Sequence, residues 1–180
     1  VRTGGYTSCA IAGADQTVEC WGHLADSMEL AGSGYFELAL GGDHACGINS
    51  EGLACAGGNT YGQTAVPSLI KPKQVAAGQY HTCALHASGV KCWGRNDYGQ
   101  STVPSLSKPL MIAAGTNHSC AVDETGVVCW GEKLFETPAL TNVRQLGLGR
   151  LTSCAITDST TSGISGGALD GNSSGVATHN

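Results

Sequence analysis

Residues 75–100 read VAAGQYHTCALHASGVKCWGRNDYGQ, and related stretches recur along most of the chain. Residues 112–131 read IAAGTNHSCAVDETGVVCWG, which repeats the first part of that stretch. The first cysteine of the pattern recurs every 37 residues, at Cys9, Cys46, Cys83 and Cys120, and Cys154 follows after 34. A fixed period of this length indicates a repeat architecture, in which function belongs to the stack of units rather than to one unit.

Five repeat units occupy residues 1–157, each opening with an apolar residue eight positions before its first cysteine. They start at Val1, Leu38, Val75, Ile112 and Leu146. Short apolar stretches separated by Gly, Asn, Asp, Ser and Pro predict strands and turns, and no segment has a sustained helical period. The sequence therefore predicts an all-β repeat protein. Residues 158–180, rich in Ser, Thr and Gly, form a degenerate end of the last unit or a tail.

A second cysteine follows the first in four of the units. With Cys83 opposite Cys92 in a hairpin, the turn centres on Ala87 and Ser88, and Gly89 supplies a positive φ. The first unit is two residues longer here, and an even insertion keeps every side chain on its original face. The spacing favours four disulfides: Cys9–Cys20, Cys46–Cys55, Cys83–Cys92 and Cys120–Cys129.

Zinc and free thiols are the alternatives for these cysteines. His44, His81 and His118 each lie two residues before a first cysteine, so one unit offers three zinc ligands. A structural zinc site needs four, usually with closer cysteine spacing. Because Thr7 and Thr152 replace the histidine elsewhere, we interpret the histidines as scaffold residues and expect neither a metal nor a cofactor.

Cys154 is predicted to be an unpaired thiol, because Ser165 stands where its partner is expected. An odd cysteine in a secreted protein is either a free thiol or a link to another chain, and the framework position favours a buried thiol. Two sequons, at Asn117 and Asn172, predict N-glycosylation. Asn172 is the better candidate because it lies in the Ser/Gly-rich tail, whereas Asn117 falls in an expected strand.

Composition places the protein outside the cell or at its surface. Nine cysteines in neighbouring pairs favour an oxidising compartment, and the chain begins at Val1 without a signal peptide, as expected for a processed or excerpted form. The net charge is −5 and the nine basic residues are scattered, which argues against nucleic-acid binding. No apolar run is long enough for a membrane span, so we expect no membrane insertion.

The motifs around Cys83 and Cys92, AGQYHTCAL and CWGRNDYGQ, resemble repeats of the regulator of chromosome condensation family, and GNTYGQ at residues 58–63 repeats the end of the second. The cysteines make the chain similar to shorter extracellular variants of that repeat. The resemblance implies a β-propeller, here of about five short blades, open or closed. It also implies that Trp21, Trp93 and Trp130 pack between units. The nucleotide exchange and chromatin binding of nuclear members do not carry over, because their loops and basic surface have no counterpart here.

Catalytic constellations are weak, so we expect no enzyme. Residues 163–167 read GISGG and fit G-x-S-x-G only formally, because neither the strand nor the helix of a nucleophile elbow is predicted around them. We expect a structural or interaction scaffold with protein partners, including copies of itself as the subunit of a filament or surface appendage. The alternatives are a glycan-binding propeller or a protein inhibitor. A glycan would use a ligand face of Asn59, Tyr61, Gln63, Asn96, Tyr98 and Gln100.

Overall fold

The computed structural model describes residues 1–132, 139–150 and 152–158. These residues form five small antiparallel sheets and a short 3₁₀ turn, η1 (Ala25–Ser27). The sheets contain, in order, β1 (Arg2–Gly4), β2 (Thr7–Ala12) and β3 (Thr17–Gly22); β4 (Glu37–Leu40), β5 (His44–Asn49) and β6 (Gly52–Gly57); β7 (Gln74–Ala77), β8 (His81–His86) and β9 (Gly89–Gly94); β10 (Met111–Ala114), β11 (His118–Asp123) and β12 (Gly126–Gly131); β13 (Val143–Leu148) and β14 (Ser153–Thr157).

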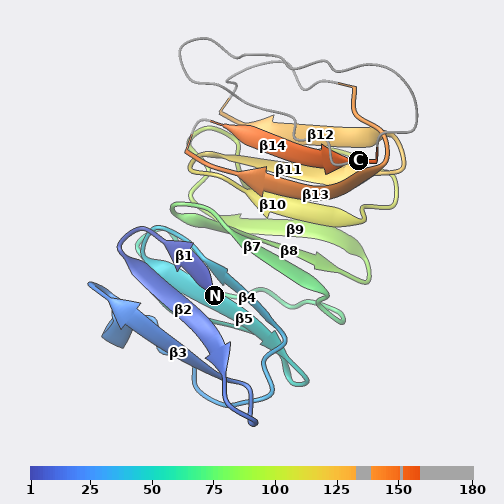
Figure 1. The fold of residues 1–180 in the computed structure, drawn as a ribbon. Helices are drawn as coiled ribbons and strands as arrows, with labels where there is room; N and C mark the ends of the chain where they lie inside the picture. Colours follow the sequence, from blue (N-terminus) through green and yellow to red (C-terminus); the bar gives the residue numbers. More distant parts are fainter. Residues whose placement is uncertain (133–138, 151, 159–180) are drawn as a thin grey trace.

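The sheets follow one another as the blades of a propeller. In each sheet the strands pair in sequence order, and the first strand packs against the first strand of the next sheet, from β1 through β4, β7 and β10 to β13. Figure 1 shows the result as an arc, with the β1–β3 sheet at one end and the β13–β14 sheet at the other. The predicted all-β, propeller-like fold of about five blades is confirmed, and the described residues form its open version.

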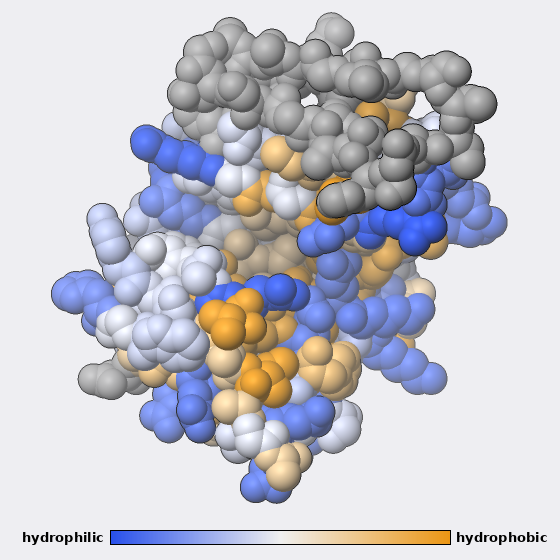
Figure 2. Space-filling model, in the orientation of Figure 1, coloured by the Kyte–Doolittle hydropathy of each residue, from blue (hydrophilic) through white to orange (hydrophobic). Residues whose placement is uncertain are grey.

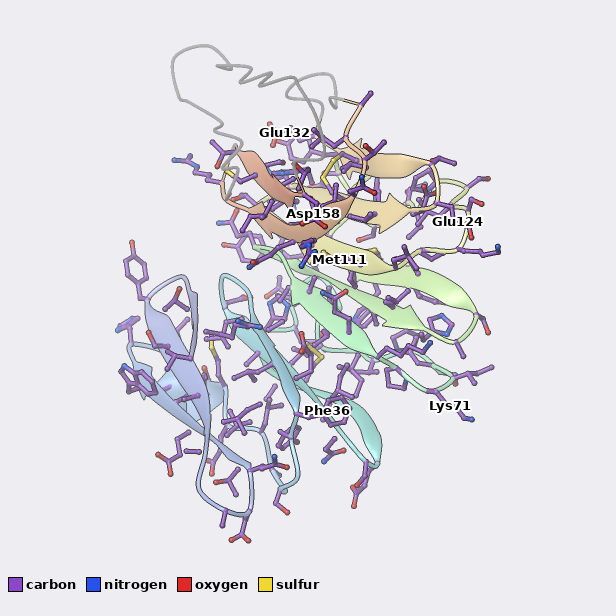
Figure 3. The ribbon with its side chains drawn as sticks, turned by 45° about the vertical axis from the view of Figure 1, so that its right-hand side comes forward. Phe36, Lys71, Met111, Glu124, Glu132 and Asp158 are labelled. Atoms are coloured by element: carbon purple, nitrogen blue, oxygen red, sulfur yellow. A yellow bond between two sulfur atoms is a disulfide. The ribbon has the colours of Figure 1, made fainter. Side chains whose placement is uncertain are left out.

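The cysteine hairpins have the predicted register. Cys83 lies opposite Cys92 in β8 and β9, and Gly89 has φ 120° at the end of the turn. A side chain is strained at that φ, which explains a glycine there. The structure contains all four predicted disulfides, Cys9–Cys20, Cys46–Cys55, Cys83–Cys92 and Cys120–Cys129, and Figure 3 draws disulfides as yellow bonds. Each one staples the second and third strands of its own sheet.

The apolar core lies between the blades. Between the third and fourth sheets, Cys83 and Leu85 pack with Ile112, Ala121 and Trp130. Each blade thus turns its disulfide side toward the following blade, which presents its tryptophan side. Stability therefore comes from contacts between neighbouring repeats, as in other repeat proteins.

The interface between the first and second sheets is filled in another way. Here the second unit has Ala56 in place of tryptophan, and the connection between the sheets folds inward. Met28 and Tyr35 from this connection are 0% and 1% exposed, and they join Leu30 in the same apolar cluster as Ala45. A longer connection with η1 thus supplies the volume that a tryptophan occupies at the later interfaces.

Two predictions about single side chains were wrong. Trp21 is 50% exposed rather than packed between units, because its sheet is the first and no described unit covers that side. Cys154 is unpaired as predicted, but it is exposed rather than buried. In the described part of the fifth sheet β14 has no third strand beside it, whereas the corresponding cysteines lie on central strands and are 0% exposed.

Candidate functional site

A chain of hydrogen bonds joins the second and third blades. The His44 Nε2 atom lies 2.9 Å from Thr82 Oγ1, and the Thr82 hydroxyl donates to the main-chain oxygen of Gln63 at 2.8 Å. The indole N–H of Trp93 donates to the same oxygen at 2.9 Å. Because the single hydroxyl proton of Thr82 is committed to Gln63, the imidazole must donate through Nε2, which fixes its tautomer.

The third and fourth blades repeat the same arrangement. His81 Nε2 lies 2.8 Å from Ser119 Oγ, and both that hydroxyl and the Trp130 indole donate to the main-chain oxygen of Gln100. Between the fourth and fifth sheets, His118 Nε2 lies 3.1 Å from Ser153 Oγ. The recurring histidines are therefore scaffold residues that connect successive blades.

Burial keeps these histidines neutral. Burial lowers the pKa of His81 to about 4, and the nearby His44 and His118 act in the same direction. The pKa of His44 is also lowered by burial, against the smaller opposing effect of Asp43. The Nδ1 atoms of His81 and His118 are buried without a hydrogen-bond partner among the described residues, whereas His44 Nδ1 lies 3.5 Å from Asp43 Oδ1. A proton added to the His81 ring therefore finds no nearby acceptor.

The structure corrects the predicted ligand face for its two glutamines. Gln63 and Gln100 are 0% exposed, and their side-chain oxygens accept hydrogen bonds from the main-chain N–H groups of Tyr61 and Tyr98. They cannot reach a saccharide, because they hold their own loops from inside. The Asn-x-x-Gly-Gln motif by itself does not indicate that the glutamine side chain turns inward.

The two asparagines of that predicted face are exposed, but their side chains stabilise turns. Asn59 Oδ1 accepts a hydrogen bond from the main chain of Thr64, and Asn96 Oδ1 accepts one from Ser101. Asparagine commonly closes turns through such contacts. Of the six residues predicted for the ligand face, the two tyrosines remain as large exposed side chains.

Those tyrosines belong to a compact surface formed by Tyr61, Tyr80, Arg95 and Tyr98, here called the tyrosine–arginine surface. The Tyr61 and Tyr80 ring centroids are 5.3 Å apart. The Arg95 Cζ atom lies 5.2, 5.9 and 6.0 Å from the ring centroids of Tyr61, Tyr80 and Tyr98. An arginine at these distances is attracted by the ring faces.

Two neighbouring blades build this surface. Tyr61 follows β6 of the second sheet, whereas Tyr80 precedes β8 and Arg95 and Tyr98 follow β9 of the third sheet. Tyr61 is 44% exposed and Tyr98 46% exposed. The repeat pattern does not distinguish Arg95 or Tyr80 from other loop residues, so neither was predicted to belong to a binding surface. The available signal was that Tyr80 occupies the position of Asp43 one repeat earlier.

That replacement has a local consequence. Gln63 Nε2 donates to Asp43 Oδ1 at 3.1 Å. One repeat later Tyr80 replaces that aspartate, and the buried Nε2 of Gln100 has no hydrogen-bond partner among the described residues. The third blade thus loses an internal hydrogen bond where it gains an aromatic ring at the surface. Arg95 also bonds Asp97, which raises the pKa of its guanidinium and keeps it charged.

A groove of about 670 Å³ lies beside the hairpin turn at residues 86–89. This turn is at the ends of β8 and β9 that are farthest from the tyrosine–arginine surface. The walls of the groove include Leu85, Val90, Leu106 and the exposed Leu110. Lys108 at its edge pairs with Glu124 at 2.7 Å, and Figure 3 shows Glu124 and Lys71 on the same edge of the stacked sheets. On the face of the molecule drawn in Figure 2, exposed apolar residues form separate patches among polar ones.

The remaining predicted sites have simple outcomes. The side-chain amide of Asn117 donates to Glu132 at 2.9 Å in a half-buried position just before β11, and its glycosylation stays a prediction. Asn172 and the GISGG stretch lie outside the described residues. Within the described ranges there is no group of three His, Cys, Asp or Glu residues suited to a metal ion. No described helix is long and apolar enough to cross a membrane.

Residues 73–100 match the model of the Regulator of chromosome condensation (RCC1) repeat. The predicted resemblance is confirmed. The matching stretch contains β7, β8 and β9 and three of the four residues of the tyrosine–arginine surface. The matched residues thus form the third of the three-stranded blades. No curated protein matches the chain in sequence.

Several solved structures share the propeller-like fold of this chain. The CRINKLY WD40 ectodomain of the Arabidopsis thaliana receptor kinase ACR4 has a TM-score of 0.68 at 24% identity, covering 82% of this chain and 55% of its own. The Physcomitrella patens receptor kinase CR4 ectodomain has a TM-score of 0.72 at 23% identity, with 82% and 44% covered. Prp20p from Saccharomyces cerevisiae has a TM-score of 0.63 at 18% identity, with 75% and 50% covered. The chain thus spans about half the length of these proteins.

Proposed function

We propose that this chain is a non-enzymatic, extracellular interaction scaffold that binds protein partners through the tyrosine–arginine surface. The surface carries the proposal because it gathers three tyrosines and an arginine at one end of two adjacent blades. Tyrosine and arginine are enriched among the residues that dominate protein–protein binding energies. Tyrosine offers a large contact area at a low entropy cost, and its hydroxyl can bond a polar partner.

The architecture suits such a role. Four disulfides and the packing between blades hold the loops that carry Tyr61, Arg95 and Tyr98, so little ordering is needed on binding. Gln63 and Gln100 fix the main chain at both tyrosines from inside. In support, the matching Prp20p structure is described with binding to Gsp1p and histones, although the nine basic residues of this chain are scattered along its sequence.

An extracellular location is supported by two observations. Four disulfides within 180 residues favour an oxidising compartment. Two of the similar structures are ectodomains of receptor kinases. Assembly into a filament or appendage and the glycan-binding alternative remain separate predictions. The buried glutamines weaken the glycan alternative, because each of the two candidate sites loses one amide.

A binding comparison tests the proposal. The native, disulfide-bonded protein is used to capture extracellular proteins from its source, alongside a variant with Tyr61→Ser, Arg95→Ser and Tyr98→Ser. We expect the captured set to be lost in the triple variant. A matched control carries Ile70→Ser and Leu110→Ser, which alter two other exposed apolar side chains, 60% and 66% exposed, and it should bind as the native protein does.

A glycan array separates this proposal from the lectin alternative. Saccharide binding by the native protein, or competition of the captured proteins by free saccharide, would favour a lectin. If the triple variant binds the same proteins as the native protein, the tyrosine–arginine surface is not the binding surface. Light scattering of the native and reduced protein reports independently on self-assembly, including any that depends on Cys154.

A further inference from the structure

The first blade presents an incomplete copy of the interface that joins the later blades. At the interface between the second and third blades, the earlier blade contributes a histidine and the main-chain oxygen of a Gln loop, and the later blade contributes a hydroxyl and a tryptophan. The interface between the third and fourth blades uses the same four groups. These two interfaces define a pairing rule: a histidine and a Gln loop on the earlier blade pair with a hydroxyl and a tryptophan on the later blade.

The groups on the two sides of an interface change together. The first unit has Thr7 in place of the histidine and lacks the Asn-x-x-Gly-Gln loop. The second unit, which follows it, has Ala45 and Ala56 in place of the hydroxyl and the tryptophan. Met28 and Leu30 from the connection fill this interface instead. A hydroxyl and a tryptophan therefore occur where the preceding unit offers the histidine and the loop.

The first blade carries the hydroxyl and the tryptophan on its outer side. Ser8 lies directly opposite Trp21 in β2 and β3, one position from the Cys9–Cys20 pair. Thr82 and Trp93 have the same placement beside Cys83–Cys92, as do Ser119 and Trp130 beside Cys120–Cys129. Yet Trp21 is 50% exposed, and this outer side forms one end of the arc in Figure 1.

We propose that the Ser8–Trp21 side of the first blade is a docking surface for a further repeat unit of this type, one that has a histidine before its first cysteine and an Asn-x-x-Gly-Gln loop. The loop would accept hydrogen bonds from the Trp21 indole and the Ser8 hydroxyl through one main-chain oxygen, and the histidine would donate to Ser8. A unit like the first one, with Thr7 and the Met28 connection, does not fit this side. The inference is independent of the tyrosine–arginine surface.

The chain itself supplies the probe. In one variant, a second copy of residues 38–74, which contains His44 and the Gln63 loop, is placed in phase before Val1. In the matched control, the added segment is a second copy of residues 1–37, which has the same length but lacks both features. Mass analysis without reduction checks that each extension forms its additional disulfide.

Trp21 provides the readout. In the 38–74 extension we expect its fluorescence emission to shift to shorter wavelength and its quenching by acrylamide to fall, each by comparison with the same extension carrying Trp21→Phe. In the 1–37 extension Trp21 should remain as accessible as in the present chain. Replacing Ser8 and Trp21 with alanine should reverse the preference, so that the 1–37 extension raises the melting temperature more than the 38–74 extension does.

Three results would overturn the proposal. One is a folded 38–74 extension in which Trp21 stays accessible. Another is equal protection of Trp21 by both extensions, because the pairing rule would then carry no selectivity. The third is failure of the 38–74 extension to form its added disulfide while the 1–37 extension does so. The alanine reversal provides a second measurement that does not depend on fluorescence.

Discussion

Acidification from pH 7 to pH 4 should destabilise the protein through its buried histidines, and His81 gives the largest resolved effect. Its pKa is lowered from 6.5 to about 4, first by burial and then by the neighbouring His44 and His118. The unfolded chain therefore binds a proton more readily than the folded chain between these two values. Its contribution to stability is complete above pH 6.5 and is lost as the pH falls toward 4.

The magnitude follows from the size of the shift. A difference of one pKa unit corresponds to about 1.4 kcal/mol, so a shift from 6.5 to about 4 removes roughly 3 kcal/mol at the acid end. His44 and His118 act in the same direction, because burial lowers the pKa of each. A loss of this size is a substantial part of the stability of a typical domain, about 5–15 kcal/mol.

Denaturant unfolding with the disulfides intact, measured at several pH values between 7 and 4, provides the assay. The free energy of unfolding should fall steeply between pH 6.5 and 4 in the native protein. A His81→Gln variant should be less stable at pH 7 but should show a shallower fall. His23→Gln, at an exposed position, is the matched control and should keep the native slope. Equal slopes for the native protein and His81→Gln would refute the reasoning.

Three further predictions concern single positions. Gly78→Ala should destabilise the protein by about 1–3 kcal/mol in thermal unfolding, because the added Cβ would overlap the His81 ring, whereas Gly147→Ala, with open space around it, should change little. Trp93→Phe should cost about 1 kcal/mol in denaturant unfolding through the lost hydrogen bond to Gln63, and Trp21→Phe should cost clearly less; equal losses would contradict the interface described above. Iodoacetamide should label one thiol per native chain without prior reduction, at Cys154, and peptide mapping that finds no label there would show that the thiol is covered.

Much of the fold was predictable because the repeat carries its information locally. The interval between two cysteines and the glycine after the turn fix the register of a hairpin, since strand side chains alternate with a period of two. This reasoning placed Cys83 opposite Cys92 correctly, and the two-residue insertion in the first unit did not disturb it. The histidines were also interpreted correctly as scaffold, because threonine replaces them in other units.

Errors arose where the environment of a side chain depends on how the chain folds around it. Trp21 and Trp93 follow their cysteines in the same way, yet one is half exposed and the other hydrogen-bonds a preceding loop. Gln63 and Gln100 resembled ligand-binding amides because their loop is polar, but each side chain turns inward to its own main chain. The exposure of a tryptophan depends on what lies across its interface, which a single repeat does not encode. The direction of each glutamine depends on how its own loop closes, which the residue types alone do not show.

The sequence by itself determined the period of the repeat, the four disulfides and the strands that they join, because these features depend on residues close together in the chain. The tertiary structure decided which side chains became buried between blades, which polar atoms met across them, and that Tyr61, Tyr80, Arg95 and Tyr98 share one surface. The physical reason is that each blade buries its apolar side only against its neighbours. Burial, the pKa of His81 and the exposure of Trp21 at one end of the arc are therefore properties of the stack of blades.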